Sequence, residues 1–152
     1  MGSFSAYRSL TLFCECIPRI ELCVWWNVSH CRPHLVKATQ SVIKLICGQF
    51  RHVGTSVRSR HCQLCDTWEA DDVPHLLFKC NQFSGQRNQL WDNVLNSMPE
   101  PMSHHVLNLN VNDKARFLLS GFNVSFTREW LDVYGAVAIF ASSLYNKKVT
   151  QR

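Results

Sequence analysis

The sequence predicts a mainly α fold, a helical domain into which one small module rich in cysteine and histidine is inserted. Apolar residues recur at helical spacing near residues 35–46, 83–98 and 130–144. Three cysteines and a histidine lie between the first two stretches, at residues 62–80. The length of 152 residues and the hydrophobic content of 46% suit one compact domain with a buried core and argue against disorder.

Residues 1–34 form an N-terminal segment whose structure stays open at this stage. Its apolar, β-branched and aromatic residues suit either a strand or a short helix. Pro18 interrupts the stretch, and the sequence HCRPH at residues 30–34 is typical of a turn.

Residues 35–61 are predicted to form a helix and then a basic loop. One helix face would collect Leu35, Ala38, Val42 and Ile46. Gly48 is a plausible end for this helix. The loop that follows, RHVGTSVRSRH at residues 51–61, is rich in arginine and histidine.

Residues 62–82 contain the most informative motif, in which two residues separate Cys62 from Cys65, nine separate Cys65 from His75, and four separate His75 from Cys80. Zn²⁺ prefers four tetrahedral ligands drawn from thiolate sulfur and imidazole nitrogen. A tight turn would aim the first two cysteines at one ion, and a short helical turn that ends before Cys80 would bring the second pair together. Four protein ligands leave no position for water, so the spacing predicts one structural Zn²⁺ in a small zinc knuckle.

Two alternatives to this zinc knuckle stay open. His61 could compete with His75 as the nitrogen ligand. The four residues could also be unrelated, as three core thiols and a surface histidine.

Residues 83–148 are predicted to form the C-terminal helices. The first would present Phe83, Arg87, Leu90, Val94 and Met98 on one face and end before Pro99. The sequence HHVLNLNV at residues 104–111 would connect it to a short helix capped by Asn112, with Asp113 in its first turn. The last helix would bury a stripe formed by Trp130, Val133, Val137, Ala141 and Leu144, with Glu129 at its start and Lys147 and Lys148 at its end.

The uneven charge distribution suggests a polyanionic partner, RNA or DNA, although charge alone favours the alternative of an ordinary solvated basic surface. Residues 1–61 carry eight Lys or Arg and two acids, a net charge of +6, whereas residues 62–152 carry eight and nine, a net charge of −1. The cations around the knuckle are the candidate nucleic-acid contacts: Arg51, Arg58, Arg60, Lys79 and Arg87. Trp68 offers an aromatic surface for a base, whereas Glu69, Asp71 and Asp72 would repel phosphate on their side.

The cysteine distribution predicts an intracellular protein, in the cytoplasm or the nucleus. The chain opens without a signal-peptide pattern, and no apolar stretch reaches the ~18 residues of a membrane span. The remaining cysteines are expected to be free thiols in a reducing compartment: Cys14, Cys16, Cys23, Cys31 and Cys47.

The segment CQLCDTWEADDVPHLLFKCNQFSGQRNQLW, residues 62–91, resembles the Cys-Cys-His-Cys region near the C-terminus of non-LTR (LINE-type) retrotransposon reverse transcriptases. The positions that match are Cys62, Leu64, Cys65, His75, Leu77, Phe78, Cys80, Phe83, Arg87, Leu90 and Trp91. The flanking sequences resemble the helices around that region, so the similarity covers about residues 20–148.

This resemblance implies a fragment, because neither the polymerase nor the endonuclease of such elements fits in this chain. The family's aromatic-Ala-Asp-Asp motif, which contains the metal-binding dyad, is absent: Asp71 and Asp72 follow Ala70 inside the zinc loop. It implies a catalytically silent module that assists binding of template RNA or target DNA, with the rest of a reverse transcriptase supplied in trans. The alternative is a zinc-stapled protein-interaction domain with no nucleic-acid role. An enzyme is poorly supported, since no Ser/His/Asp set or open metal site is readable.

Overall fold

The computed structural model describes residues 24–47, 61–62, 64–65, 67, 69–70, 72–100, 102–120 and 128–150. Among these residues it contains helices and one isolated β-bridge, and no strand, which confirms the mainly α class. No helix in the described ranges combines the length and the apolar content needed to cross a membrane.

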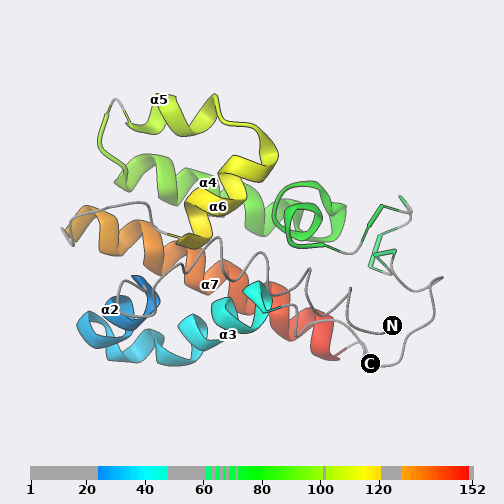
Figure 1. The fold of residues 1–152 in the computed structure, drawn as a ribbon, viewed down its shortest axis with the longest axis horizontal. Coiled ribbons are helices and arrows are strands. Elements are labelled where there is room, and N and C mark those ends of the chain that lie inside the picture. Colours follow the sequence, from blue (N-terminus) through cyan, green and yellow to red (C-terminus); the bar gives the residue numbers. More distant parts are fainter. Residues whose placement is uncertain are drawn as a thin grey trace, which may run out of the picture.

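The central element is α7 (Arg128–Thr150), against which most of the other helices pack. α2 (Val24–Cys31) and α3 (Val36–Ile46) lie on one side of α7, whereas α4 (Ser84–Ser97), α5 (Met102–Leu107) and α6 (Val111–Ser120) lie on the other (Figure 1). Short helical turns complete the fold: the 3₁₀ helices η2 (Pro33–Leu35) and η5 (Asn81–Phe83) and the π-helix η4 (His75–Lys79).

Helical periodicity predicted the buried faces of the long helices correctly. All five residues of the α7 stripe, from Trp130 to Leu144, are buried. Leu35, Val42 and Ile46 are buried beside α7, and Ala38 is half-buried. On α4, Leu90 and Val94 are buried, as is Met98 immediately after the helix.

The core joins segments far apart in the chain. The Trp25 indole donates a hydrogen bond of 2.7 Å to the carbonyl of Leu119, 94 residues away. Its ring meets that of Tyr134 edge-on at 5.7 Å, and Tyr134 stacks on Trp130 at 6.2 Å. This aromatic cluster fixes α2 and α6 on α7.

Two predictions between α4 and α7 are wrong. Residues 104–107 belong to α5 rather than to a connector. Val106 is fully buried in the core, and this burial stabilises a helix that the local sequence pattern does not predict. Asn110, not Asn112, caps α6: its Oδ1 accepts the Asp113 N–H at 2.9 Å. Asp113 does lie in the first turn of α6.

The two alternatives for the N-terminal segment are resolved for residues 24–31, which are helical as α2. The turn predicted at residues 30–34 begins after Cys31, where Arg32 leads into η2. Cys31 and Cys47 are free thiols, whereas Cys14, Cys16 and Cys23 lie outside the described residues.

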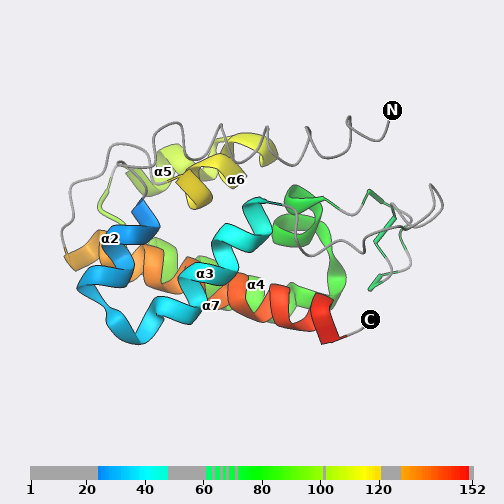
Figure 2. The ribbon, with the colours of Figure 1, turned by 60° about the horizontal axis from the view of Figure 1, so that its bottom comes forward.

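The knuckle lies between α3 and α4 in the chain and beside the C-terminal end of α7 in space (Figure 2). Lys147, in the last turn of α7, places its ammonium 5.1 Å from the centre of the buried Phe83 ring, where the knuckle joins α4. The C-terminal end of α7 therefore packs against the junction of the knuckle and α4.

Candidate metal centre

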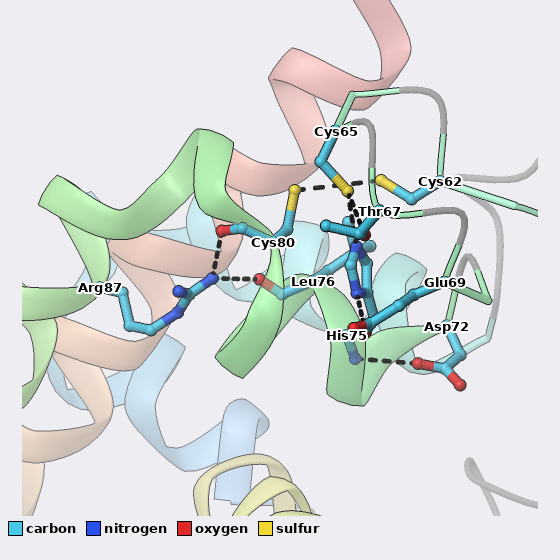
Figure 3. Close-up of polar contacts among 9 residues, drawn as sticks. All are labelled: Cys62, Cys65, Thr67, Glu69, Asp72, His75, Leu76, Cys80 and Arg87. Carbon is cyan, nitrogen blue, oxygen red and sulfur yellow. Dashed lines mark hydrogen bonds and ion pairs between the residues drawn. The ribbon is translucent and has the colours of Figure 1, made fainter.

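The four predicted ligands converge on one point. The ligand atoms of Cys62, Cys65, His75 and Cys80 all lie within 4.8 Å of one another, and all four side chains are buried (Figure 3). Cys65 Sγ lies 3.3 Å from His75 Nε2, and Cys62 Sγ lies 3.9 Å from Cys80 Sγ. His61, the competing ligand, is not part of this group; it is exposed, and its backbone forms a β-bridge with Ala70.

These distances fit a tetrahedral metal ion. Zn–S bonds near 2.3 Å and Zn–N bonds near 2.0 Å set tetrahedral edges of about 3.8 Å between two sulfurs and about 3.5 Å between sulfur and nitrogen. The observed 3.9 Å and 3.3 Å lie close to these edges. The four residues, whose ligand atoms all lie within 4.8 Å of one another, could therefore hold a metal ion.

The π-helix η4 explains how ligands five residues apart meet. In a regular α-helix, residues 75 and 80 would point about 140° apart. Instead, the Cys80 N–H donates to the carbonyl of His75 at 2.8 Å, a wide i→i+5 turn, and the backbone of Cys80 then becomes extended. The Asp72 carboxylate caps this turn by accepting the His75 N–H at 2.8 Å.

Amide groups around the first two cysteines form the other half of the site. The Cys62 N–H donates to the Glu69 carbonyl at 2.9 Å, which closes the loop between the two ligand pairs. The amides of Leu64 and Cys65 in turn donate to the Cys62 sulfur, and the amide of Thr67 donates to the Cys65 sulfur. Such N–H···S bonds stabilise thiolates, the form that binds metals.

Glu69 orients the histidine ligand. Its Oε2 lies 2.9 Å from His75 Nδ1, on the side of the ring away from Cys65 (Figure 3). A carboxylate at Nδ1 fixes the tautomer that carries its proton there, which leaves the Nε2 lone pair directed at the sulfurs. The sequence-based interpretation of Glu69 as a phosphate-repelling acid overlooked this role.

The thiol pKa values divide according to environment. Burial raises the pKa of Cys80 to about 12, and burial also raises the pKa of Cys62. At Cys65, burial raises the pKa, but hydrogen bonds with Thr67, Cys62 and His75 outweigh it and lower the pKa to about 7. A metal ion would have to displace the protons of Cys62 and Cys80, so binding is coupled to proton release.

Arg87 fastens the knuckle to α4. Its Nε donates to the Leu77 carbonyl at 2.7 Å, and its Nη2 donates to the Cys80 carbonyl at 2.6 Å and to the Leu76 carbonyl at 3.4 Å. These carbonyls lie at the end of η4, where helix groups lack intrahelical partners. The structure thus places this predicted nucleic-acid residue, half-buried, against the backbone of a metal ligand.

The other predicted nucleic-acid residues fall in two groups. Arg51, Arg58 and Arg60 lie outside the described residues, as does Trp68. Lys79 is exposed and borders a cavity of about 380 Å³ between the knuckle and the start of α6. Glu69 and Asp72 line the same cavity, so the phosphate repulsion expected from the sequence would act directly beside Lys79.

Sequence reasoning missed the partners of the ligands rather than the ligands themselves. A carboxylate in the loop before a ligand histidine was the available signal for Glu69. Asp72, three residues before His75, had the spacing of a helix cap. No local pattern announced Arg87, because its acceptors are backbone carbonyls.

Comparison of the chain with known proteins found no matching family model, no similar curated protein and no similar solved structure.

Proposed function

We propose that this chain is a catalytically silent fragment of a non-LTR retrotransposon reverse transcriptase. In this proposal, one structural Zn²⁺ at Cys62, Cys65, His75 and Cys80 stabilises a module that helps bind template RNA or target DNA. The convergence of the four ligand atoms within 4.8 Å is the observation that carries the proposal.

Zinc is the metal that the donor set favours. Three thiolates and one imidazole in tetrahedral spacing are typical of structural zinc, whereas calcium and magnesium select oxygen ligands. All four donors are buried side chains of the chain itself, which supports a structural rather than a catalytic role. A reducing compartment, cytoplasm or nucleus, would keep the three thiols available as ligands.

The nucleic-acid role is supported by charge and by resemblance. The net charge of +6 in residues 1–61 would attract a polyanion, and the knuckle sequence resembles the reverse-transcriptase segment. The polymerase would then have to act in trans or be absent altogether.

A protein-interaction domain is the second candidate, favoured by one exposed side chain. Trp26 on α2 is 67% exposed. Because tryptophan is enriched at protein–protein interfaces relative to the rest of the protein surface, this side chain is a candidate contact for a protein partner. In this alternative the zinc only staples the helices, and the partner binds the α2 side.

Metal analysis of the purified chain tests the zinc site. The wild-type protein should contain one zinc per chain, and Cys65→Ser and His75→Ala should lose zinc together with much of the helical circular-dichroism signal. Cys31→Ser is the matched control, because Cys31 is exposed and outside the cluster. Full zinc content in both ligand variants would show the ligand assignment to be wrong.

Salt dependence separates the two candidate functions. Binding of single-stranded RNA or duplex DNA should weaken steeply between ~50 and ~200 mM salt, with a slope in log K of about −0.7 to −0.9 per phosphate contacted. A protein interface centred on Trp26 should show little salt dependence, and it should weaken in Trp26→Ala while nucleic-acid binding does not.

A further inference from the structure

The lysines and the acids of α7 lie at opposite ends of the helix. Glu129 lies in the first turn beside Arg128, and Asp132 lies one turn later in an ion pair with Arg32, whereas Lys147 and Lys148 lie in the last turn. At 1.5 Å per residue the 23 residues of α7 span about 34 Å, so the basic end of α7 lies far from its two acids. The knuckle stands at the basic end (Figure 2).

A third lysine joins this end from another part of the chain. Lys44, in the last turn of α3, places its ammonium 5.3 Å from the centre of the Tyr145 ring. Tyr145 and Lys148 are three residues apart on α7 and therefore neighbours on its surface. We call Lys44, Tyr145 and Lys148 the α3–α7 basic surface. Lys147, two residues from Tyr145, faces Phe83 on another side of α7 and is not part of this surface.

The two knuckle acids that the structure describes, Glu69 and Asp72, face away from this surface. Glu69 and Asp72 lie on the side of the metal centre opposite the C-terminal end of α7 and border the cavity toward α6 (Figure 3). Both carboxylates are also bonded to His75, which holds them there.

We infer that the α3–α7 basic surface is where this module contacts a single-stranded nucleic acid. The inference rests on the proposed function and deepens it by locating the contact away from the knuckle loop. Lysines spaced around a half-exposed tyrosine combine phosphate contacts with a ring on which a base can stack. Lys79, beside the carboxylates, contributes little to this contact.

A double variant, Lys44→Gln with Lys148→Gln, tests the inference. The probe is a short fluorescein-labelled single-stranded RNA, titrated with the zinc-loaded full chain over a range of salt concentrations. Loss of two phosphate contacts should make the slope of log K against log[salt] shallower by about 1.4 and weaken binding at ~50 mM salt on the order of tenfold to 100-fold.

The control variant removes the same charge elsewhere: Lys37→Gln and Arg128→Gln, both exposed, taken from α3 and α7. It should keep the wild-type slope, and replacing the two surface lysines with arginine should restore binding. Should the first variant lose zinc, Lys44→Gln alone replaces it, because Lys44 is exposed on α3; its slope should be shallower by about 0.7.

The outcomes separate this inference from the proposed function. Equal weakening in the two double variants would mean that net charge alone acts, and would overturn the inference while RNA binding stands. An unchanged slope in the lysine variants would also overturn it. A wild-type protein that binds anionic lipid vesicles but no RNA would overturn both.

Discussion

Replacing Arg87 with methionine would remove the three hydrogen bonds that tie α4 to the end of η4. Two of them are short, at 2.7 Å to Leu77 and 2.6 Å to Cys80, and the third, at 3.4 Å, adds little. Hydrogen bonds from charged groups contribute about 1.5 kcal/mol each at the low end of their range, which suits a half-buried side chain. Relief of the guanidinium from its partly buried site offsets part of this sum, since burial lowers the pKa of Arg87. We therefore expect a loss of about 2 kcal/mol in the free energy of unfolding.

Urea denaturation of the zinc-loaded chain, followed by circular dichroism, measures this loss. For a slope of about 1–3 kcal/mol per molar urea, the midpoint should fall by roughly 1 M with the slope unchanged. Arg116→Met is the control: its ion pair with Asp113, at 3.6 Å, is exposed, and such pairs contribute only about 0–1 kcal/mol. The sequence-based interpretation of Arg87 as a phosphate contact makes the opposite prediction, unchanged stability with a shallower salt slope. A midpoint equal to that of the wild type would refute the structural reasoning.

Three further variants test other features. Glu69→Gln should weaken zinc affinity about 10–100-fold in a chelator competition, because His75 loses the carboxylate that orients its ring. Asp92→Asn, at an exposed position of α4, is the control and should keep the wild-type affinity. Equal zinc affinities of Glu69→Gln and the wild type would exclude the orienting role. Gly85→Ala should raise the unfolding free energy by up to ~1 kcal/mol, because the new methyl group meets no atom within 4 Å. Gly135→Ala should raise it less, because its methyl group would lie 3.3 Å from both Arg32 Nη1 and Leu35 Cδ1. A higher melting temperature for Gly135→Ala than for Gly85→Ala would contradict this packing. Burial raises the pKa of Tyr134, so the folded state holds the neutral phenol, and stability should be full below pH ~10 and fall as pH rises beyond it. Tyr134→Phe should lack that alkaline loss and be at least as stable at neutral pH, because the buried hydroxyl has no hydrogen-bond partner in the described residues; melts of the two proteins at both pH values decide.

The buried faces of the long helices and the four metal ligands were predictable from the sequence, because each depends on local geometry. The stripe of α7 repeats every three or four residues, and the ligand motif needs only a tight turn and one short helix. The short helical turn expected before Cys80 is present, although its hydrogen bonding is of the π type.

Features that depend on contacts distant in the chain were not predictable in this way. α5 is held by burial of Val106, and the guanidinium of Arg87 reaches carbonyls 7 to 11 residues away. Asn110 and Asn112 have equal capping potential by composition, and the packing of α5 against α6 decides between them. In the metal centre, the sequence indicated the four ligands, whereas the choice of Glu69 as the His75 partner required the loop geometry.

The bond from Trp25 to Leu119 has a consequence for synthesis on the ribosome. α2 emerges early, but its indole acceptor on α6 and the aromatic rings of α7 are translated about a hundred residues later. The nascent chain must therefore hold α2, α3 and the knuckle without their central support, and the hydrophobic core can close only once α7 has left the exit tunnel. A stalled product that lacks α7 should accordingly be a substrate for chaperones and proteases rather than a smaller folded protein.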